Sequence, residues 1–229
     1  LLEEIKKLDP LHFNLNFDYA DLDKGNSEAI VMAVTLDNEY FFSEFEPLTK
    51  TYINNIQMFF QIMFYNFNTK TLIASIPYDV TMPFLSKEKI SNDAIVNEIN
   101  NFYTKGLKSA DDGTLIKAFT QVGKILSDYR LKDKYKFRIG VRDINIEDKA
   151  LEHIPAVFVS NQKAFKNILA QNFAGRLSVH NDIALVPYIE GMAIGGTMKQ
   201  QFVNSDEIYD IKLPKPEFII DITLRGYKK

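Results

Sequence analysis

Alternating apolar and polar positions predict strands at both ends of this chain. Near the start, Leu11–Tyr19 alternates without a break, which is typical of a strand with one buried and one solvated face. Ala29–Leu36 is rich in β-branched and apolar residues and predicts a strand buried on both faces. The last third predicts further strands in Asp182–Tyr188, Gly196–Asn204, Glu207–Leu213 and Glu217–Gly226.

A hairpin of two long strands is predicted between these ends. The apolar run Ile56–Phe67 leads through Asn68–Lys70 into a second apolar run, Thr71–Tyr78. Pro77 is expected to end the second strand or to mark an edge of the sheet, because proline lacks a backbone N–H. The stretch FYNFNTKTLIASIP, Phe64–Pro77, resembles the central hairpin of bacterial envelope lipoproteins of the curli-secretion type. No activity and no residue role is carried over from this resemblance.

Apolar residues at helical spacing predict helices in the middle of the chain. The first follows a cap at Ser91 or Asn92, the second lies within Asp111–Tyr129, and the third begins after Ser160 or Asn161 and ends at Gly175. A strand, Phe137–Ile146, separates the second helix from the third. The predicted fold class is therefore α+β: a mostly antiparallel or mixed sheet, built from strands at both ends of the chain, with about three helices packed on it.

Length and composition fit a globular protein with a large aromatic core. The 229 residues include 46% hydrophobic residues, with 18 Phe, 11 Tyr and no Trp. No internal repeat, low-complexity tract or linker divides the chain, so a single α+β domain over residues 1–229 is expected, with a subdivision near residue 130 as the alternative. The most apolar run, Ile56–Phe67, is interrupted by Gln57 and Gln61 and is shorter than the roughly 20 residues that span a bilayer, so no transmembrane segment is expected.

Charge and cysteine content exclude several function classes. A net charge of -3 argues against a dedicated nucleic-acid binder, whose charge is usually strongly positive. The absence of cysteine excludes disulfides, thiolate nucleophiles and thiolate metal ligands. Because the chain begins at Leu1 rather than at Met, we expect a removed leader. The expected location is periplasmic or membrane-anchored through that leader, with the cytoplasm as the alternative.

No catalytic, cofactor or metal site is predicted. The glycines of Ser178–Phe202 lie between two predicted strands, whereas a phosphate loop leads from a strand into a helix, so they indicate a bend. Ser178, His180 and Asp182 share one local run and cannot form the relay of a catalytic triad. The polar side chains between His12 and Asp18 are more typical of a solvated strand face than of a metal site.

The most unusual charge pattern is a run of cations at alternate positions in RLKDKYKFR, which starts at Arg130. If this segment is extended, the cations form one stripe while Leu131, Tyr135 and Phe137 face the other way. Such a stripe would bind an anionic partner, although lysines at an edge also serve to block aggregation. The predicted binding residues are Arg130, Lys132, Lys134, Lys136, Arg138 and Arg142.

These observations favour a non-enzymatic binding or assembly module, expected in a bacterial cell envelope, that contacts a protein or an anionic envelope component. Two alternatives stay open. The aromatic residues of Tyr40–Phe45 and Phe59–Phe67 would line the cavity of a carrier for lipids or apolar small molecules. A hydrolase would instead need an unrecognised site near His153 or His180. The partner, any substrate and the oligomeric state do not follow from the sequence.

Overall fold

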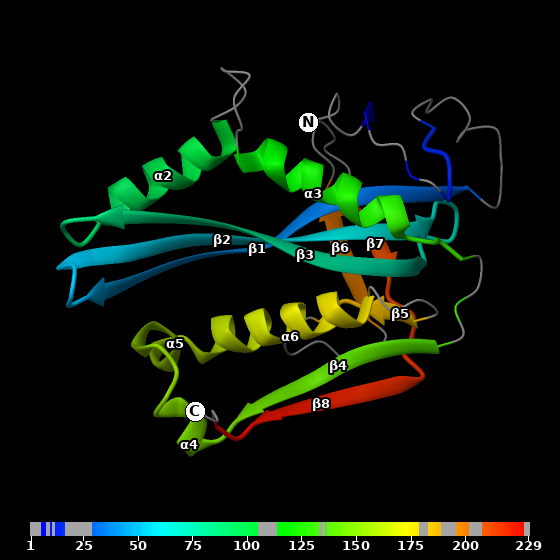
Figure 1. Ribbon diagram of the computed structural model, residues 1–229. Coiled ribbons are helices and arrows are strands. Elements are labelled where there is room, and N and C mark those ends of the chain that lie inside the picture. The colour runs from blue at the N-terminus through cyan, green and yellow to red at the C-terminus, as the bar shows by residue number, and fades with distance from the viewer. Residues whose placement is uncertain are drawn as a thin grey trace. The chain divides into compact units, whose positions relative to one another are not determined.

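The computed structural model shows a chain with mixed α/β content in which strands outnumber helices (Figure 1). The structure describes residues 6–7, 10, 12–16, 29–104, 114–132, 135, 137–178, 183–188, 196–201 and 208–226. Within these ranges there are eight strands in three sheets and five helices. In the sequence, three long strands come first, two helices follow, and the remaining strands and helices lie between Phe137 and Leu224.

The chain divides into two compact units, and both contain parts of the three longest strands. Unit 1 consists of Leu1–Asn16, Leu36–Phe60 and Asp79–Arg130, and unit 2 consists of Phe17–Thr35, Gln61–Tyr78 and Leu131–Lys229.

The three longest strands form one sheet in the order β1–β2–β3. These strands are β1 (Ile30–Glu46), β2 (Thr51–Asn66) and β3 (Leu72–Ser86). Because each consecutive pair is joined by a short loop, neighbouring strands run antiparallel. The predicted hairpin is confirmed as β2–β3, and Asn66 shapes its loop by accepting a hydrogen bond from the backbone N–H of Thr69 at 2.8 Å. Pro77 lies inside β3, which is an outer strand of this sheet.

Burial in this sheet follows strand position. The central strand β2 is buried at every residue from Met58 to Tyr65, whereas Ala33 alone is buried in β1. The prediction that the strand beginning near Ala29 is buried on both faces was therefore wrong, because that strand lies at the outside of the sheet and continues to Glu46.

The predicted first strand, Leu11–Tyr19, is not formed at the residues that the structure describes. His12 lies in a turn, Phe13 in a bend, and residues 14–16 have irregular backbone, while the rest of the predicted strand lies outside the described residues. The alternation itself is kept, since Phe13 and Leu15 are half-buried and the residues next to them are exposed. Alternation reports which side chains face an apolar surface, and a strand also needs a hydrogen-bonded partner strand.

Unit 1 contains the first two predicted helices, α2 (Asn92–Thr104) and α3 (Thr114–Asp128). Ser91 caps α2, because its Oγ accepts a hydrogen bond from the backbone N–H of Ala94 at 3.3 Å. The hydroxyl of Tyr103, near the end of α2, donates to Glu39 of β1. Burial first, and this carboxylate second, raise the pKa of Tyr103 well above its usual range.

Unit 2 contains two smaller sheets and three helices within the described residues. The strands β5 (Ile183–Val186), β4 (Phe137–Ile146) and β8 (Phe218–Leu224) form a parallel sheet in that order, and β6 (Thr197–Gln201) pairs with β7 (Ile208–Lys212) in an antiparallel sheet. All five of these predicted strands are confirmed. The helices α4 (Asp148–Leu151) and α5 (Ala156–Ser160) are too short to produce a helical pattern in the sequence.

The third predicted helix is confirmed as α6 (Gln162–Ser178), with a different end. Asn161 caps it, because its Oδ1 accepts the backbone N–H of Ala164 at 3.1 Å. Gly175 does not end the helix as predicted and lies inside it. A Cβ atom at Gly175 would come within 3.2 Å of the backbone oxygen of Pro77, so this glycine allows α6 to pack closely against β3.

Candidate binding surface on the parallel sheet

One face of the parallel sheet is covered by α6. Figure 1 shows this helix running alongside β4. Ile144 of β4 is fully buried in a cluster with Ala170 of α6 and Tyr188, and Ile146 is buried in a second cluster with Phe165 of α6. These contacts form the core of this part of unit 2, and they direct the alternate residues of β4 to the opposite face.

The opposite face of the same sheet is exposed and polar. Arg142, Asp143 and Asn145 of β4 are exposed, as are Asp221 and Thr223 of β8. The register pairs Asp143 with Asp221 and Asn145 with Thr223, so these side chains lie side by side. Parallel sheets are almost always covered on both faces, which makes an exposed polar face unusual.

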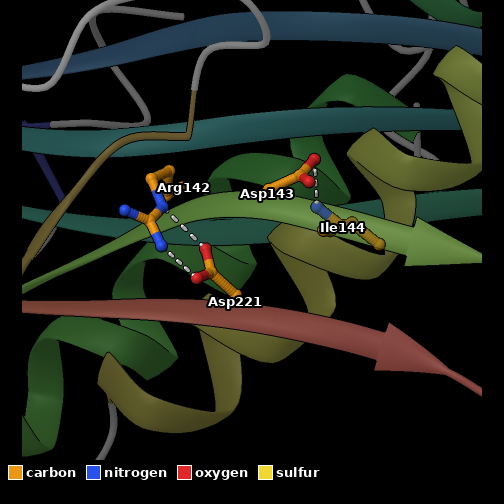
Figure 2. Close-up of polar contacts among 4 residues, drawn as sticks. All are labelled: Arg142, Asp143, Ile144 and Asp221. Carbon is orange, nitrogen blue, oxygen red and sulfur yellow. Dashed lines mark hydrogen bonds and ion pairs between the residues drawn. The ribbon is translucent and has the colours of Figure 1, made fainter.

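A β-bulge lies in the middle of this face. The register between β4 and β8 shifts between Val141 and Asp143, so Arg142 is the extra residue in β4. A bulge bends the strand locally and redirects the side chain of the extra residue. The carboxylate of Asp143 accepts a hydrogen bond from the backbone N–H of Ile144 at 2.8 Å, as Figure 2 shows.

Arg142 and Asp221 form a two-point ion pair across the two strands (Figure 2). The Nε atom of Arg142 donates to Oδ1 of Asp221 at 2.9 Å, and its Nη2 atom donates to Oδ2. These hydrogen bonds, followed by the charge of the arginine, lower the pKa of Asp221, and the hydrogen bond to Asp221 raises the pKa of Arg142. The geometry matches the planar fork of a guanidinium to a carboxylate.

A second ion pair joins Arg138 of β4 to Glu217, which directly precedes β8. The backbone N–H of Arg138 donates to Oε2 of Glu217 at 2.6 Å, and Nη1 of Arg138 lies 3.5 Å from Oε1. The backbone N–H is the main reason that the pKa of Glu217 is lowered. Both carboxylates are therefore ionised at neutral pH, so this surface presents paired positive and negative charges.

The structure brings together two of the six predicted binding residues. Arg138 and Arg142 lie on β4 and are paired with carboxylates of the β8 segment. Arg130 is exposed and Lys132 is half-buried, while Lys134 and Lys136 lie outside the described residues. Sequence reasoning missed Glu217 and Asp221 as the partners, which are 79 residues away along the chain. The sequence did contain one signal. The two arginines are four residues apart in one apolar segment, and the two acidic residues are four residues apart in another.

The other residues considered from the sequence do not gather into a site. Ser178 is buried at the end of α6 and donates to the backbone oxygen of Gly175 at 2.9 Å, whereas His180 and Asp182 lie outside the described residues. His12 and His153 are exposed. In the part of the chain that the structure describes, no group of three or more His, Cys, Asp or Glu residues could hold a metal ion.

The aromatic residues proposed for a carrier cavity have mixed environments. Tyr40 stacks on Phe42 with ring centroids 6.0 Å apart and meets the edge of Phe59 at 5.9 Å. Phe45 is exposed and contacts Tyr52 at 5.2 Å. Four members of the set are buried in β2, namely Phe59, Phe60, Phe64 and Tyr65. A carrier function stays a prediction.

Comparisons with known proteins found no family model, no curated protein and no solved structure that matches this chain. Among the described helices, none is both long and apolar enough to span a membrane.

Proposed function

We propose that this chain is a non-enzymatic binding or assembly module and that the exposed face of β4 and β8 contacts a partner protein. The observation that carries the proposal is the parallel sheet itself, because α6 covers one face while Arg142, Asn145, Asp221 and Thr223 are exposed on the other. Proteins normally cover both faces of a parallel sheet, so this face fits a surface that becomes buried in a complex.

The chemistry of the face supports a protein partner. The ion pairs of Arg138 and Arg142 hold both guanidinium groups in place before binding, which lowers the entropy lost when a partner docks. Because the two arginines are already neutralised by Glu217 and Asp221, a polyanion gains little from this face alone. A protein surface with both donors and acceptors matches it better.

The basic segment before β4 is the part of the chain that we propose attracts an anionic partner. Arg130 is exposed, and the predicted stripe continues through Lys132, Lys134 and Lys136. A run of closely spaced cations increases the rate at which an acidic partner associates. We therefore propose that the segment attracts an acidic protein and that the β4–β8 face holds it.

Site-specific photocrosslinking in cells tests the contact face. A photoreactive phenylalanine analogue placed at Thr223 should give a discrete protein adduct, identifiable by mass spectrometry. The matched control is the same analogue at Thr120, which is exposed on α3 of unit 1. No adduct from Thr223 or Asn145, or the same adducts from Thr120, would count against the proposal.

Charge reversal tests the basic segment. Changing Lys132, Lys134 and Lys136 to Glu should weaken binding to polyglutamate about ten-fold at low salt, as measured by fluorescence anisotropy. The control changes Lys50, Lys87 and Lys89 to Glu, which alters net charge equally at three exposed positions of unit 1. Equal losses in both variants would show a general charge effect. Heparin and anionic vesicles, titrated in parallel, show whether the segment prefers an acidic polypeptide.

Several parts of the prediction stay proposals. The envelope location is tested by cell fractionation. The organisation of residues 1–229 as one α+β domain is tested by limited proteolysis, because a boundary near residue 130 should be cleaved between residues 129 and 136.

A further inference from the structure

The outer strands of the sheets differ in how well they are protected against pairing with another chain. β3 carries Pro77 and Pro83, which cannot donate backbone hydrogen bonds. β1 carries only acidic charges, so two copies of it would repel each other. β8 has the sequence FIIDITL and contains no proline and no lysine, the residues that commonly block an edge.

The edge of β8 is also accessible. Within the described part of the chain, β8 has a hydrogen-bonded neighbour, β4, on one side only. Phe218 is 52% exposed and Ile219 is 40% exposed, which is unusual for large apolar residues in a strand. A long apolar edge of this kind is a template for pairing with a further strand.

The sequence around β8 is complementary to itself in an antiparallel arrangement. If two copies pair about Asp221, residues at equal distances before and after it lie opposite each other. On the polar face, Glu217 then meets Arg225 of the second copy. On the face toward α6, Phe218 meets Leu224 and Ile220 meets Ile222 of the second copy. Opposite charges meet, and apolar residues extend the existing core.

The centre of this arrangement places the two Asp221 side chains opposite each other. Like charges in this position normally destabilise a sheet. Each Asp221 is already held at two points by Arg142, so the charge at the centre is compensated on both copies. Arg225 has a side chain that is 81% exposed and lies 3.6 Å from Glu147, a contact at the surface that leaves it able to reach a second partner.

We propose that two copies of this chain associate by antiparallel pairing of their β8 strands, which joins two parallel sheets into one continuous sheet. This inference concerns the edge of β8 rather than the exposed face, and it does not depend on the proposed function. Symmetric pairing of identical surfaces is the commonest way in which proteins form dimers.

Sedimentation velocity of the whole chain over a range of concentrations tests the proposal. The wild type should show a reversible dimer, and Ile219→Lys should shift it to monomer because a lysine on the edge opposes pairing. The control is Val159→Lys, which changes a residue of α5 that is 45% exposed and should leave the dimer intact. A wild type that stays monomeric up to about 100 µM, or a dimer that Ile219→Lys leaves unchanged, overturns the proposal.

Charge exchange tests the register. Arg225→Glu and Glu217→Arg should each raise the dissociation constant about ten-fold, because each places like charges opposite each other. Mixing the two variants should restore dimers. These would be heterodimers, in which an acidic residue faces an arginine at both pairs of positions 217 and 225. Because Glu217 also contacts Arg138, circular dichroism must first show that Glu217→Arg is folded. If it is not, Arg225→Glu with Arg176→Glu as its control still decides the outcome.

Discussion

The hairpin β2–β3 and the pair β4–β8 show two ways of using polar side chains across neighbouring strands. In the hairpin, Ser75 donates to Gln61 at 2.7 Å, and both side chains are buried. In the parallel pair, Arg142 and Asp221 are exposed and fully charged. Neutral groups can be buried once they are hydrogen-bonded, whereas burying charges costs more, so the charged pairs stay at the surface where a partner can reach them.

The same comparison separates stability from recognition. The centre of β2 is buried on both faces, so the hydrophobic effect holds it in place. β8 buries no residue fully, and its exposed groups contribute little to folding. We expect mutations in β2 to change stability and mutations in β8 to change association. This division between the two strands can be tested by mutation.

Two isoleucine substitutions, one in β2 and one in β8, should differ most in their effect on the free energy of unfolding. Ile62→Ala in β2 removes a fully buried side chain and should lower the free energy of unfolding by about 2–5 kcal/mol. Ile219→Ala in β8, where the side chain is 40% exposed, should cost less than about 1 kcal/mol at concentrations where the chain is monomeric. Urea denaturation measures both, and equal losses would contradict the division.

A matched serine pair tests the buried hydrogen bond. Ser75→Ala removes the hydroxyl that donates to Gln61, and it should lower the free energy of unfolding by about 1–3 kcal/mol because water cannot replace the lost donor. Ser160→Ala removes an exposed hydroxyl bonded to the backbone of α5 and should stay within about 0.5 kcal/mol. A similar cost at both positions would show that burial is not the deciding factor.

The exposed ion pair should show a weaker coupling than the buried pair. A double-mutant cycle of Arg142→Gln and Asp221→Asn should give a smaller coupling energy than the cycle of Ser75→Ala and Gln61→Leu. Added salt should reduce the first coupling and leave the second nearly unchanged. A salt-insensitive Arg142–Asp221 coupling would indicate that this face is shielded from solvent.

The pH dependence of stability that comes from Asp221 is expected to be the smallest of these effects. Because the pKa of Asp221 is lowered from its ordinary 3.8 in the folded chain, its stabilisation is present above 3.8 and is lost as the pH falls through the lower folded value. Carbon-detected NMR titration of the carboxyl group should show this shift, and Arg142→Gln should move the pKa back up. An unchanged titration in Arg142→Gln would mean that the arginine is not its cause.

Local patterns explain why most elements could be predicted. The helices α2, α3 and α6, the hairpin β2–β3 and the strands of unit 2 follow from periodicity, caps and turn residues that act over a few residues. Two local patterns did not give the structure that was predicted from them. Residues 12–16 alternate without forming a strand, and Gly175 lies inside a helix because β3 approaches it closely.

The candidate surface was predicted only in part, because it depends on pairing between distant segments. The cations at Arg138 and Arg142 were recognised as a stripe from their spacing alone. Their partners, Glu217 and Asp221, and the bulge that redirects Arg142 depend on the register of β4 against β8. Nothing in a local pattern states which of several strands will become the neighbour.

By itself, the sequence determined the positions of most strands and helices, the burial of the apolar run in β2, and the absence of cysteine chemistry. Tertiary structure alone decided that β4 and β8 are parallel neighbours, that their charges neutralise each other, and that β8 is left at an edge. The physical reason is range: backbone geometry and side-chain periodicity act between near neighbours, whereas strand register is set by packing between segments far apart in the chain.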